Sequence, residues 1–145
     1  MITMWYATAH AQPEEILPEK LDSLQKIQPR KVFFLVGANW CKYCEMMQQT
    51  TLKNKQVVAT LNDSYYFVNF DAETKRSIKF HNKIFNYQPT GNNVGVHQLA
   101  EEIGTVEGKI SYPTICILND KFEITFKYNQ FVTARDLLKI LGELK

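Results

Sequence analysis

The clearest hydrophobic pattern in the chain is an unbroken run of five apolar residues, Val32–Val36. Such a run of β-forming residues predicts a central strand that is covered on both faces. A second, aromatic run, Tyr65–Phe70, predicts the next strand. Between the two runs apolar residues recur at helical spacing, with a break near Asn54. This order of strand, helix and strand predicts a parallel crossover.

Patterns on either side complete the predicted sheet. A short amphipathic helix begins at Pro18 and ends before Pro29. The runs Thr114–Leu118 and Glu123–Tyr128, joined by a short polar turn, predict an antiparallel hairpin. A last helix follows Thr133, whose hydroxyl suits its N-cap. The predicted fold class is therefore α/β, with a mixed central sheet of about four strands flanked by helices.

The segment between Asp71 and Pro113 is longer than such a sheet requires. Its polar, glycine-containing stretch Gln88–Gly95 predicts a loop, and Val96–Ile103 predicts a short helix. We expect either an ordinary surface insertion or an element that selects a partner. His97 is expected to be a structural residue.

Composition is that of an ordinary globular protein. The 145 residues are 45% hydrophobic and 22% charged, which suits a single domain, predicted to span residues 13–145. The net charge of +2 comes from interspersed basic and acidic residues, and we expect no nucleic-acid partner. No apolar stretch approaches the ~20 residues of a membrane span. We expect a monomer.

The N-terminal residues differ from the rest of the chain. No charged residue precedes Glu14, and Ala9-His10-Ala11 matches the small-x-small pattern of signal-peptidase sites. We interpret residues 1–12 as the remnant of an export signal, or alternatively as a disordered tail. The predicted location is periplasmic or otherwise exported, with the cytoplasm as the alternative.

Two cysteines, Cys41 and Cys44, lie three positions apart where the first predicted strand turns into a helix. A free thiol has a pKa of ~8.5, so a reactive cysteine needs an environment that favours the thiolate. The positive end of a helix supplies this environment within its first turn. Cys41 is therefore the predicted nucleophile. Cys44, one turn further on the same face, is predicted to resolve the mixed disulfide.

The third cysteine, Cys116, lies within an apolar run. Three cysteines do not form a multi-bridge disulfide scaffold. Cys116 is accordingly expected to be a buried, unreactive thiol.

Trp40 and the two cysteines at the strand-to-helix turn, together with Tyr112-Pro113-Thr114 before the third core strand, resemble the thioredoxin superfamily. The resemblance implies a cis peptide bond at Pro113, near the cysteines, and an extended substrate segment held beside it. Trp40, Tyr43, Tyr112 and Pro113 are thereby expected to contact the substrate. The segment leading to Pro113 is similar to that of exported thioredoxin-like proteins of Bacteroidetes-type bacteria.

The chain also departs from thioredoxins. Leu35 occupies the position of the buried acid that takes the proton of the resolving thiol, so water or another group must do so here. Lys42-Tyr43 replaces the Gly-Pro between the cysteines. Lys42 is expected to favour the thiolate of Cys41, or else to point into water with little effect. Tyr43 resembles the tyrosine of some periplasmic disulfide isomerases.

The predicted function is that of a thiol–disulfide oxidoreductase without a cofactor, acting on protein thiols or disulfides. It would act as a reductant resupplied by a membrane electron carrier, or as an oxidant or isomerase. The alternative is a module that binds Cu(I) through Cys41 and Cys44, helped by a methionine or His97. Zinc is disfavoured because no second ligand pair is present. A fold retained only to bind a partner is a third possibility, disfavoured by the intact cysteines.

Overall fold

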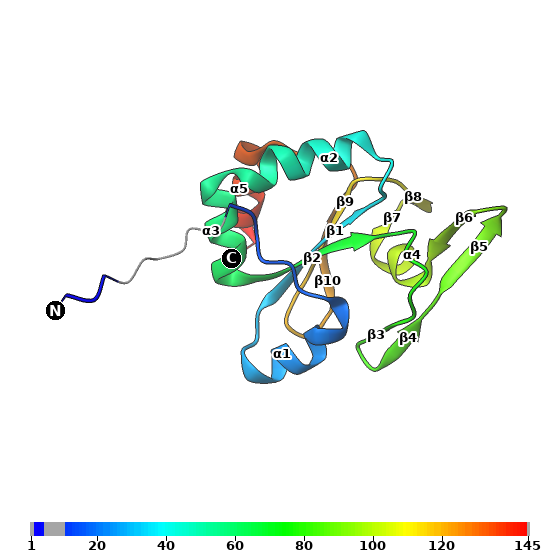
Figure 1. Ribbon diagram of the computed structural model, residues 1–145, viewed down its shortest axis with the longest axis horizontal. Helices are drawn as coiled ribbons and strands as arrows, with labels where there is room; N and C mark the ends of the chain where they lie inside the picture. Colours follow the sequence, from blue (N-terminus) through cyan, green and yellow to red (C-terminus); the bar gives the residue numbers. More distant parts are fainter. Residues whose placement is uncertain (1, 5–10, 145) are drawn as a thin grey trace.

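The computed structural model describes residues 2–4 and 11–144. Its central sheet has the order β10-β9-β1-β2 (Figure 1). The strands span Lys31–Gly37 (β1), Tyr65–Asp71 (β2), Thr114–Leu118 (β9) and Ile124–Tyr128 (β10). β1 is parallel to β2 and antiparallel to β9, and β9 is antiparallel to β10. The predicted mixed four-stranded sheet is confirmed.

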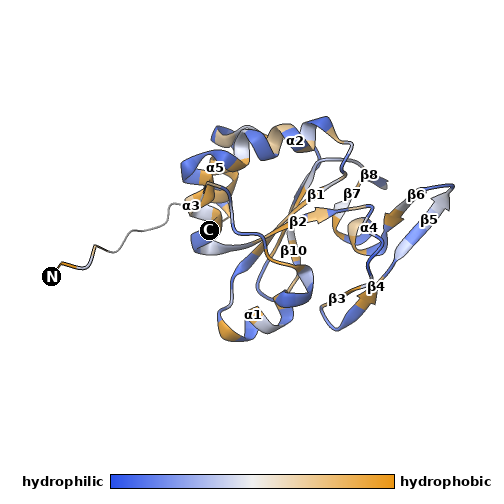
Figure 2. Ribbon diagram, in the orientation of Figure 1, coloured by the Kyte–Doolittle hydropathy of each residue, from blue (hydrophilic) through white to orange (hydrophobic). Residues whose placement is uncertain are grey.

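One face of the sheet is covered by α2 (Lys42–Gln49), the 3₁₀ helix η2 (Thr51–Lys53), α3 (Lys55–Ser64) and α5 (Ala134–Glu143). These helices alternate between hydrophilic and hydrophobic residues, as expected where one side packs on a sheet (Figure 2). The break predicted at Asn54 is confirmed. The Asn54 side chain caps α3 by accepting hydrogen bonds from the backbone N–H groups of Gln56 and Val57.

The opposite face is covered by η1 (Pro18–Lys20), α1 (Leu21–Ile27), α4 (Gln98–Gly104) and the hairpin of β3 (Ile78–Phe80) and β4 (Lys83–Phe85). Successive residues of β1 point to alternate faces. Phe33 and Leu35 therefore pack under α2, α3 and α5, whereas Phe34 packs on the other side. Covering on both faces explains why this strand is apolar throughout.

The segment between Asp71 and Pro113 differs from the prediction. Gln88–Gly95 was expected to be a loop, but it lies mostly in a hairpin of β5 (Tyr87–Gly91) and β6 (Val94–His97). The turn residue Asn93 has a φ of 56°, a conformation that asparagine tolerates. The polar residues therefore build a tight turn between paired strands. Figure 1 shows this hairpin extending away from the central sheet.

The prediction of a helix over Val96–Ile103 was wrong at the N-terminal end of the helix. Val96 and His97 belong to β6, and α4 begins at Gln98 because His97 caps it. A two-residue pair, β7 (Thr105–Val106) and β8 (Lys109–Ile110), connects α4 to the segment before β9.

The outer edge of β2, which no other strand of the sheet covers, pairs with the chain just before η1. Glu15 forms a parallel bridge with Phe67, and the Ile16 N–H donates to the Phe67 carbonyl at 2.8 Å. The interpretation of residues 1–12 as a signal remnant falls mainly on residues 1 and 5–10, which lie outside the described residues. Within the described part of the chain, every helix is too short or too polar to cross a membrane.

Candidate active site

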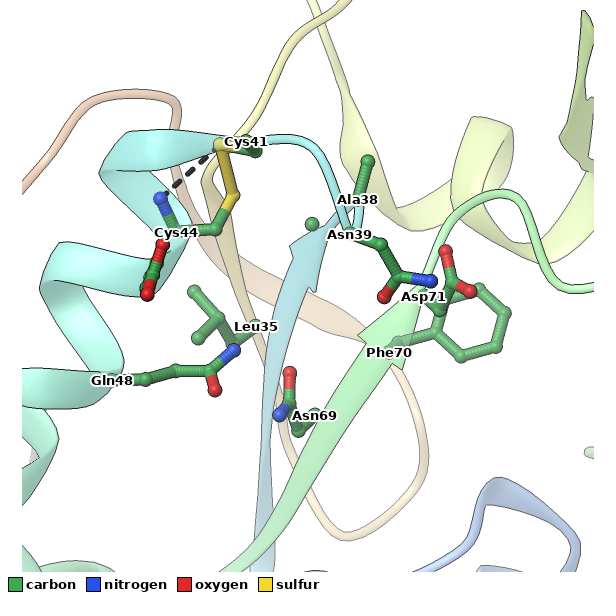
Figure 3. Close-up of a pocket in the computed structure, with 11 residues that line it drawn as sticks. Leu35, Ala38, Asn39, Cys41, Cys44, Gln48, Asn69, Phe70 and Asp71 are labelled. Atoms are coloured by element: carbon green, nitrogen blue, oxygen red, sulfur yellow. Dashed lines mark hydrogen bonds between the residues drawn. A yellow bond between two sulfur atoms is a disulfide. The ribbon is translucent and has the colours of Figure 1, made fainter.

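Cys41 and Cys44 lie where β1 turns into α2. Cys41 is the N-cap of this helix, and its Sγ accepts a hydrogen bond from the Cys44 N–H at 3.2 Å. The two residues form a disulfide, with a Cα–Cα distance of 5.3 Å (Figure 3). Cys41 is 7% exposed and Cys44 is 3% exposed. The first sulfur thus occupies the anion-favouring end of the helix, as the sequence predicts.

A cleft of about 410 Å³ opens beside the disulfide, between α2 and the ends of β1 and β2 (Figure 3). Leu35 lines this cleft and is 1% exposed. The buried position beside Cys44 is therefore occupied by an apolar side chain instead of an acid. Polar side chains also line the cleft, among them Glu45, Gln48, Asn69 and Asp71. Their presence makes the space beside Cys44 suitable for water.

The segment before β9 approaches the two cysteines. Tyr112 packs against the cluster formed by Ala38, Cys41 and Cys44. The Tyr112–Pro113 peptide bond is cis, and Pro113 is buried. Burial raises the pKa of Tyr112 above its ordinary value, and the carboxylates of Glu73 and Asp71 add to the shift. The Tyr112 hydroxyl therefore remains protonated at neutral pH.

Trp40 is held at the surface by two contacts. Its Nε1–H donates to the Glu73 carboxylate at 2.5 Å, and its ring meets that of Tyr112 edge-on at 5.8 Å. The side chain is nevertheless 69% exposed. Sequence reasoning missed Glu73, which lies 33 positions away in the loop after β2. Its position two residues beyond a strand end was the one available signal.

Further apolar side chains are exposed on the first turns of α2. Tyr43 is 61% exposed, and its ring centre lies 6.5 Å from that of Phe131. Met46 is 44% exposed, whereas Met47 is buried in the core. Trp40, Tyr43 and Met46 are thus exposed apolar side chains close in sequence to the two cysteines. Lys42, the first residue of α2, is exposed to solvent.

Cys116 is a free, fully buried thiol on β9. Burial raises its pKa to about 12, although nearby Lys127 opposes the shift. The expectation of an unreactive structural thiol therefore agrees with its surroundings.

His97 is also fully buried, and both of its ring nitrogens are engaged. Nε2 lies 2.8 Å from the Arg76 carbonyl, and Nδ1 accepts from the Leu99 N–H at 3.2 Å. Neither nitrogen is therefore available to a metal held by the cysteines. Within the described residues, no group of three or more His, Cys, Asp or Glu side chains is arranged to hold a metal ion.

Solved structures similar to this chain share its fold at low sequence identity. The oxidoreductase DsbH superposes with a TM-score of 0.63 at 16% identity, covering 99% of this chain and 92% of its own. A thioredoxin from Thermus thermophilus has a TM-score of 0.64 at 19% identity, covering 93% and 88% respectively. A thioredoxin-fold protein from Helicobacter pylori has a TM-score of 0.60 at 18% identity, covering 96% and 80%.

A search of curated protein sequences found no match. The sequence pattern of the thioredoxin-like domain, in contrast, matches residues 17–145. This match covers most of the chain and agrees with the sheet order and with the cysteine pair at the start of α2. The protein therefore belongs to the thioredoxin-like domain family.

Proposed function

We propose that the protein is a thiol–disulfide oxidoreductase that exchanges its Cys41–Cys44 pair with protein thiols and disulfides. The observation that carries this proposal is the position of Cys41, whose sulfur caps α2 and accepts the Cys44 N–H. The same N–H would stabilise a Cys41 thiolate when the pair is reduced.

In the reducing direction, the Cys41 thiolate attacks one sulfur of a substrate disulfide. The substrate S–S bond breaks, one substrate thiolate leaves, and Cys41 becomes joined to the other substrate sulfur. The Cys44 thiolate then attacks Cys41, forming the Cys41–Cys44 disulfide and releasing the second substrate thiolate. The reverse sequence oxidises a substrate dithiol and leaves Cys41 and Cys44 reduced.

Deprotonation of Cys44 does not involve residue 35, because Leu35 has no ionisable group. We assign this proton to water in the cleft, whose walls carry polar side chains from α2 and β2. Substrate is proposed to contact the exposed rings of Trp40 and Tyr43 and to lie beside Tyr112 and Pro113. Exposed aromatic side chains of this kind commonly anchor protein partners.

We also propose that the protein acts in an exported compartment such as the periplasm. Support for this location comes from the Ala9-His10-Ala11 pattern and from the resemblance to exported thioredoxin-like proteins. N-terminal sequencing of the protein from fractionated cells tests it. Cleavage near Gln12 in an extracytoplasmic fraction is the expected result, and uncleaved protein confined to the cytoplasm would contradict the proposal.

The decisive experiment for the activity is a Cys44→Ser variant expressed in cells. This variant forms the mixed disulfide but lacks the thiol that resolves it, so partner proteins remain attached to Cys41. Mass spectrometry identifies the attached proteins after non-reducing electrophoresis. A Cys41→Ser/Cys44→Ser variant, in which Cys116 is intact, is the matched control.

The expected result is a set of reducible adducts in Cys44→Ser and none in the double variant. Equal adducts in both, or none in either, would overturn the assignment of Cys41. Stoichiometric copper in freshly purified wild-type protein, together with a pair that does not cycle, would instead support the copper-binding alternative.

A further inference from the structure

The last residue of the β5–β6 hairpin holds both ends of a loop that leads to the active site. The backbone N–H of His97 donates to the Ala72 carbonyl at 2.7 Å. Nε2 of its side chain lies 2.8 Å from the carbonyl oxygen of Arg76. One buried residue thus fixes the segment 72–76, which follows β2 directly.

The ring of His97 has one arrangement that satisfies these contacts. A carbonyl only accepts hydrogen bonds, so Nε2 carries a proton and donates it to Arg76, while Nδ1 accepts from Leu99. The edge-on ring of Phe70, 5.5 Å away between centres, closes the remaining side. These contacts hold the imidazole ring in one orientation, and the ring in turn holds the loop.

The middle of this loop leads to Trp40. The Glu73 N–H donates to an Asp71 carboxylate oxygen at 2.9 Å, and the Glu73 carboxylate accepts the Trp40 Nε1–H. The Ala72 N–H also donates to the Gly37 carbonyl at 2.8 Å, where β1 ends. The loop is thus bonded to both ends of the segment 37–40, which leads directly into Cys41.

We propose that His97 is a positioning residue that sets the orientation of the Trp40 indole through Glu73. Trp40 is 69% exposed, so the core does little to fix its ring, and the Glu73 hydrogen bond with the Tyr112 contact does so instead. The inserted hairpin then governs how the substrate-facing aromatic ring is presented. This inference rests on the proposed function only for its effect on substrates.

The first test measures Trp40 directly and needs no activity. In a Trp5→Phe background Trp40 is the single tryptophan, and NMR follows exchange of its indole proton with solvent. His97→Asn shortens the donor so that it no longer reaches Arg76, and His97→Phe fills the ring volume without either hydrogen bond. His97→Gln retains a donor near the position of Nε2.

We expect exchange to become about tenfold faster in the Asn and Phe variants and in Glu73→Ala, and to remain near the wild-type rate in His97→Gln. Ile103→Ala, a buried change in α4 away from the loop, is the control for general loss of stability. Unchanged exchange in both loss variants, or equally faster exchange in Ile103→Ala, would overturn the proposal. Because His97→Asn and His97→Phe both remove the hydrogen bond to Arg76, the test still decides the proposal if one of them does not fold.

The second test compares a protein disulfide with glutathione disulfide as substrates. We expect His97→Phe to lower kcat/KM about fivefold for the protein and to leave the small disulfide nearly unaffected. Because both residues act through one contact, His97→Phe combined with Glu73→Ala should be no slower than Glu73→Ala alone. Additive losses would contradict the proposal. A wild-type protein without any exchange activity would instead refute the proposed function, while the indole measurement would still decide the role of His97.

Discussion

Gly37 lies directly against Cys44, the second cysteine of the disulfide. A β carbon built on Gly37 would stand 3.0 Å from the Cys44 sulfur and 3.4 Å from its Cβ. A methyl group at the last residue of β1 would therefore fit only if the Cys44 side chain moved by a few tenths of an ångström. Strand and disulfide are in close contact at this point.

We predict that Gly37→Ala destabilises the oxidised protein by about 1–3 kcal/mol, because the disulfide prevents the sulfur from moving away. The reduced protein should lose less stability than the oxidised protein. The equilibrium between the disulfide and dithiol forms in a glutathione buffer should therefore shift toward the dithiol. Urea unfolding of both redox forms measures the difference. Gly142→Ala, where an added β carbon meets nothing within 4 Å, is the control. Equal effects of Gly37→Ala on both forms would refute the prediction.

Cys116 is predicted to make stability depend on alkaline pH. Burial raises its pKa to about 12 in the folded protein, whereas the thiol of the unfolded chain has a pKa of about 8.5–9. Above pH 9 the unfolded chain therefore releases this proton more readily. Its contribution to stability is therefore complete below pH 9 and is lost as the pH rises toward 12. The slope should approach about 1.4 kcal/mol per pH unit in that range.

Urea unfolding of the oxidised protein at several alkaline pH values measures this slope. Cys116→Val removes the titrating thiol while keeping an apolar side chain, and its slope should be smaller by the stated amount. Identical slopes for both proteins would show that the thiol does not titrate as predicted.

Tyr43 is predicted to contribute to recognition of protein substrates. Tyr43→Ala removes an exposed ring beside Cys41 and should lower kcat/KM for a protein disulfide by about tenfold. The rate of reaction with dithiothreitol should hardly change, because a small thiol needs access only to the active-site sulfur atoms. Ile84→Ala, at a similarly exposed residue on β4, serves as the control. A uniform loss with both substrates would argue against a recognition role.

Leu35→Asp is predicted to speed release of the Cys44 proton at the expense of stability. A carboxyl group at this buried position can accept the proton, but burying it without a partner costs about 1–3 kcal/mol or more. Leu35→Asn has a similar shape without an ionisable group and is the matched control. Stopped-flow measurement of mixed-disulfide resolution should show faster, pH-dependent closure in the Asp variant alone. Equal rates in both variants would mean that proton removal from Cys44 does not limit this step.

The central fold could be predicted because each element carries a local signal. The apolar run Val32–Val36 allows a strand buried on both faces. Asn54 carries a side chain suited to capping, and Thr133 does too, with its Oγ1 3.2 Å from the Asp136 N–H. The two active-site cysteines were predicted for the same reason, since their spacing and their place at a helix start are local.

The rest depends on contacts between residues distant in sequence. Asn, Gly and Pro occur both in open loops and in tight hairpin turns, so the β5–β6 hairpin was not distinguishable from a loop. The hydrogen bond between Trp40 and Glu73 spans 33 positions, and that between His97 and Arg76 spans 21. Neither pair has a spacing that any local pattern encodes. Buried polar side chains such as His97 find their partners only once the chain has folded.

The bridge between Glu15 and Phe67 has a practical consequence for any shortened form of the protein. An unpaired strand edge presents free backbone groups that other chains can join, which favours aggregation. A version of the chain that begins at Pro18 would keep every helix and strand of the described residues but would expose the backbone of β2 at Phe67. A stable recombinant domain should therefore start before Glu14, because the residues just ahead of η1 shield the sheet from self-association.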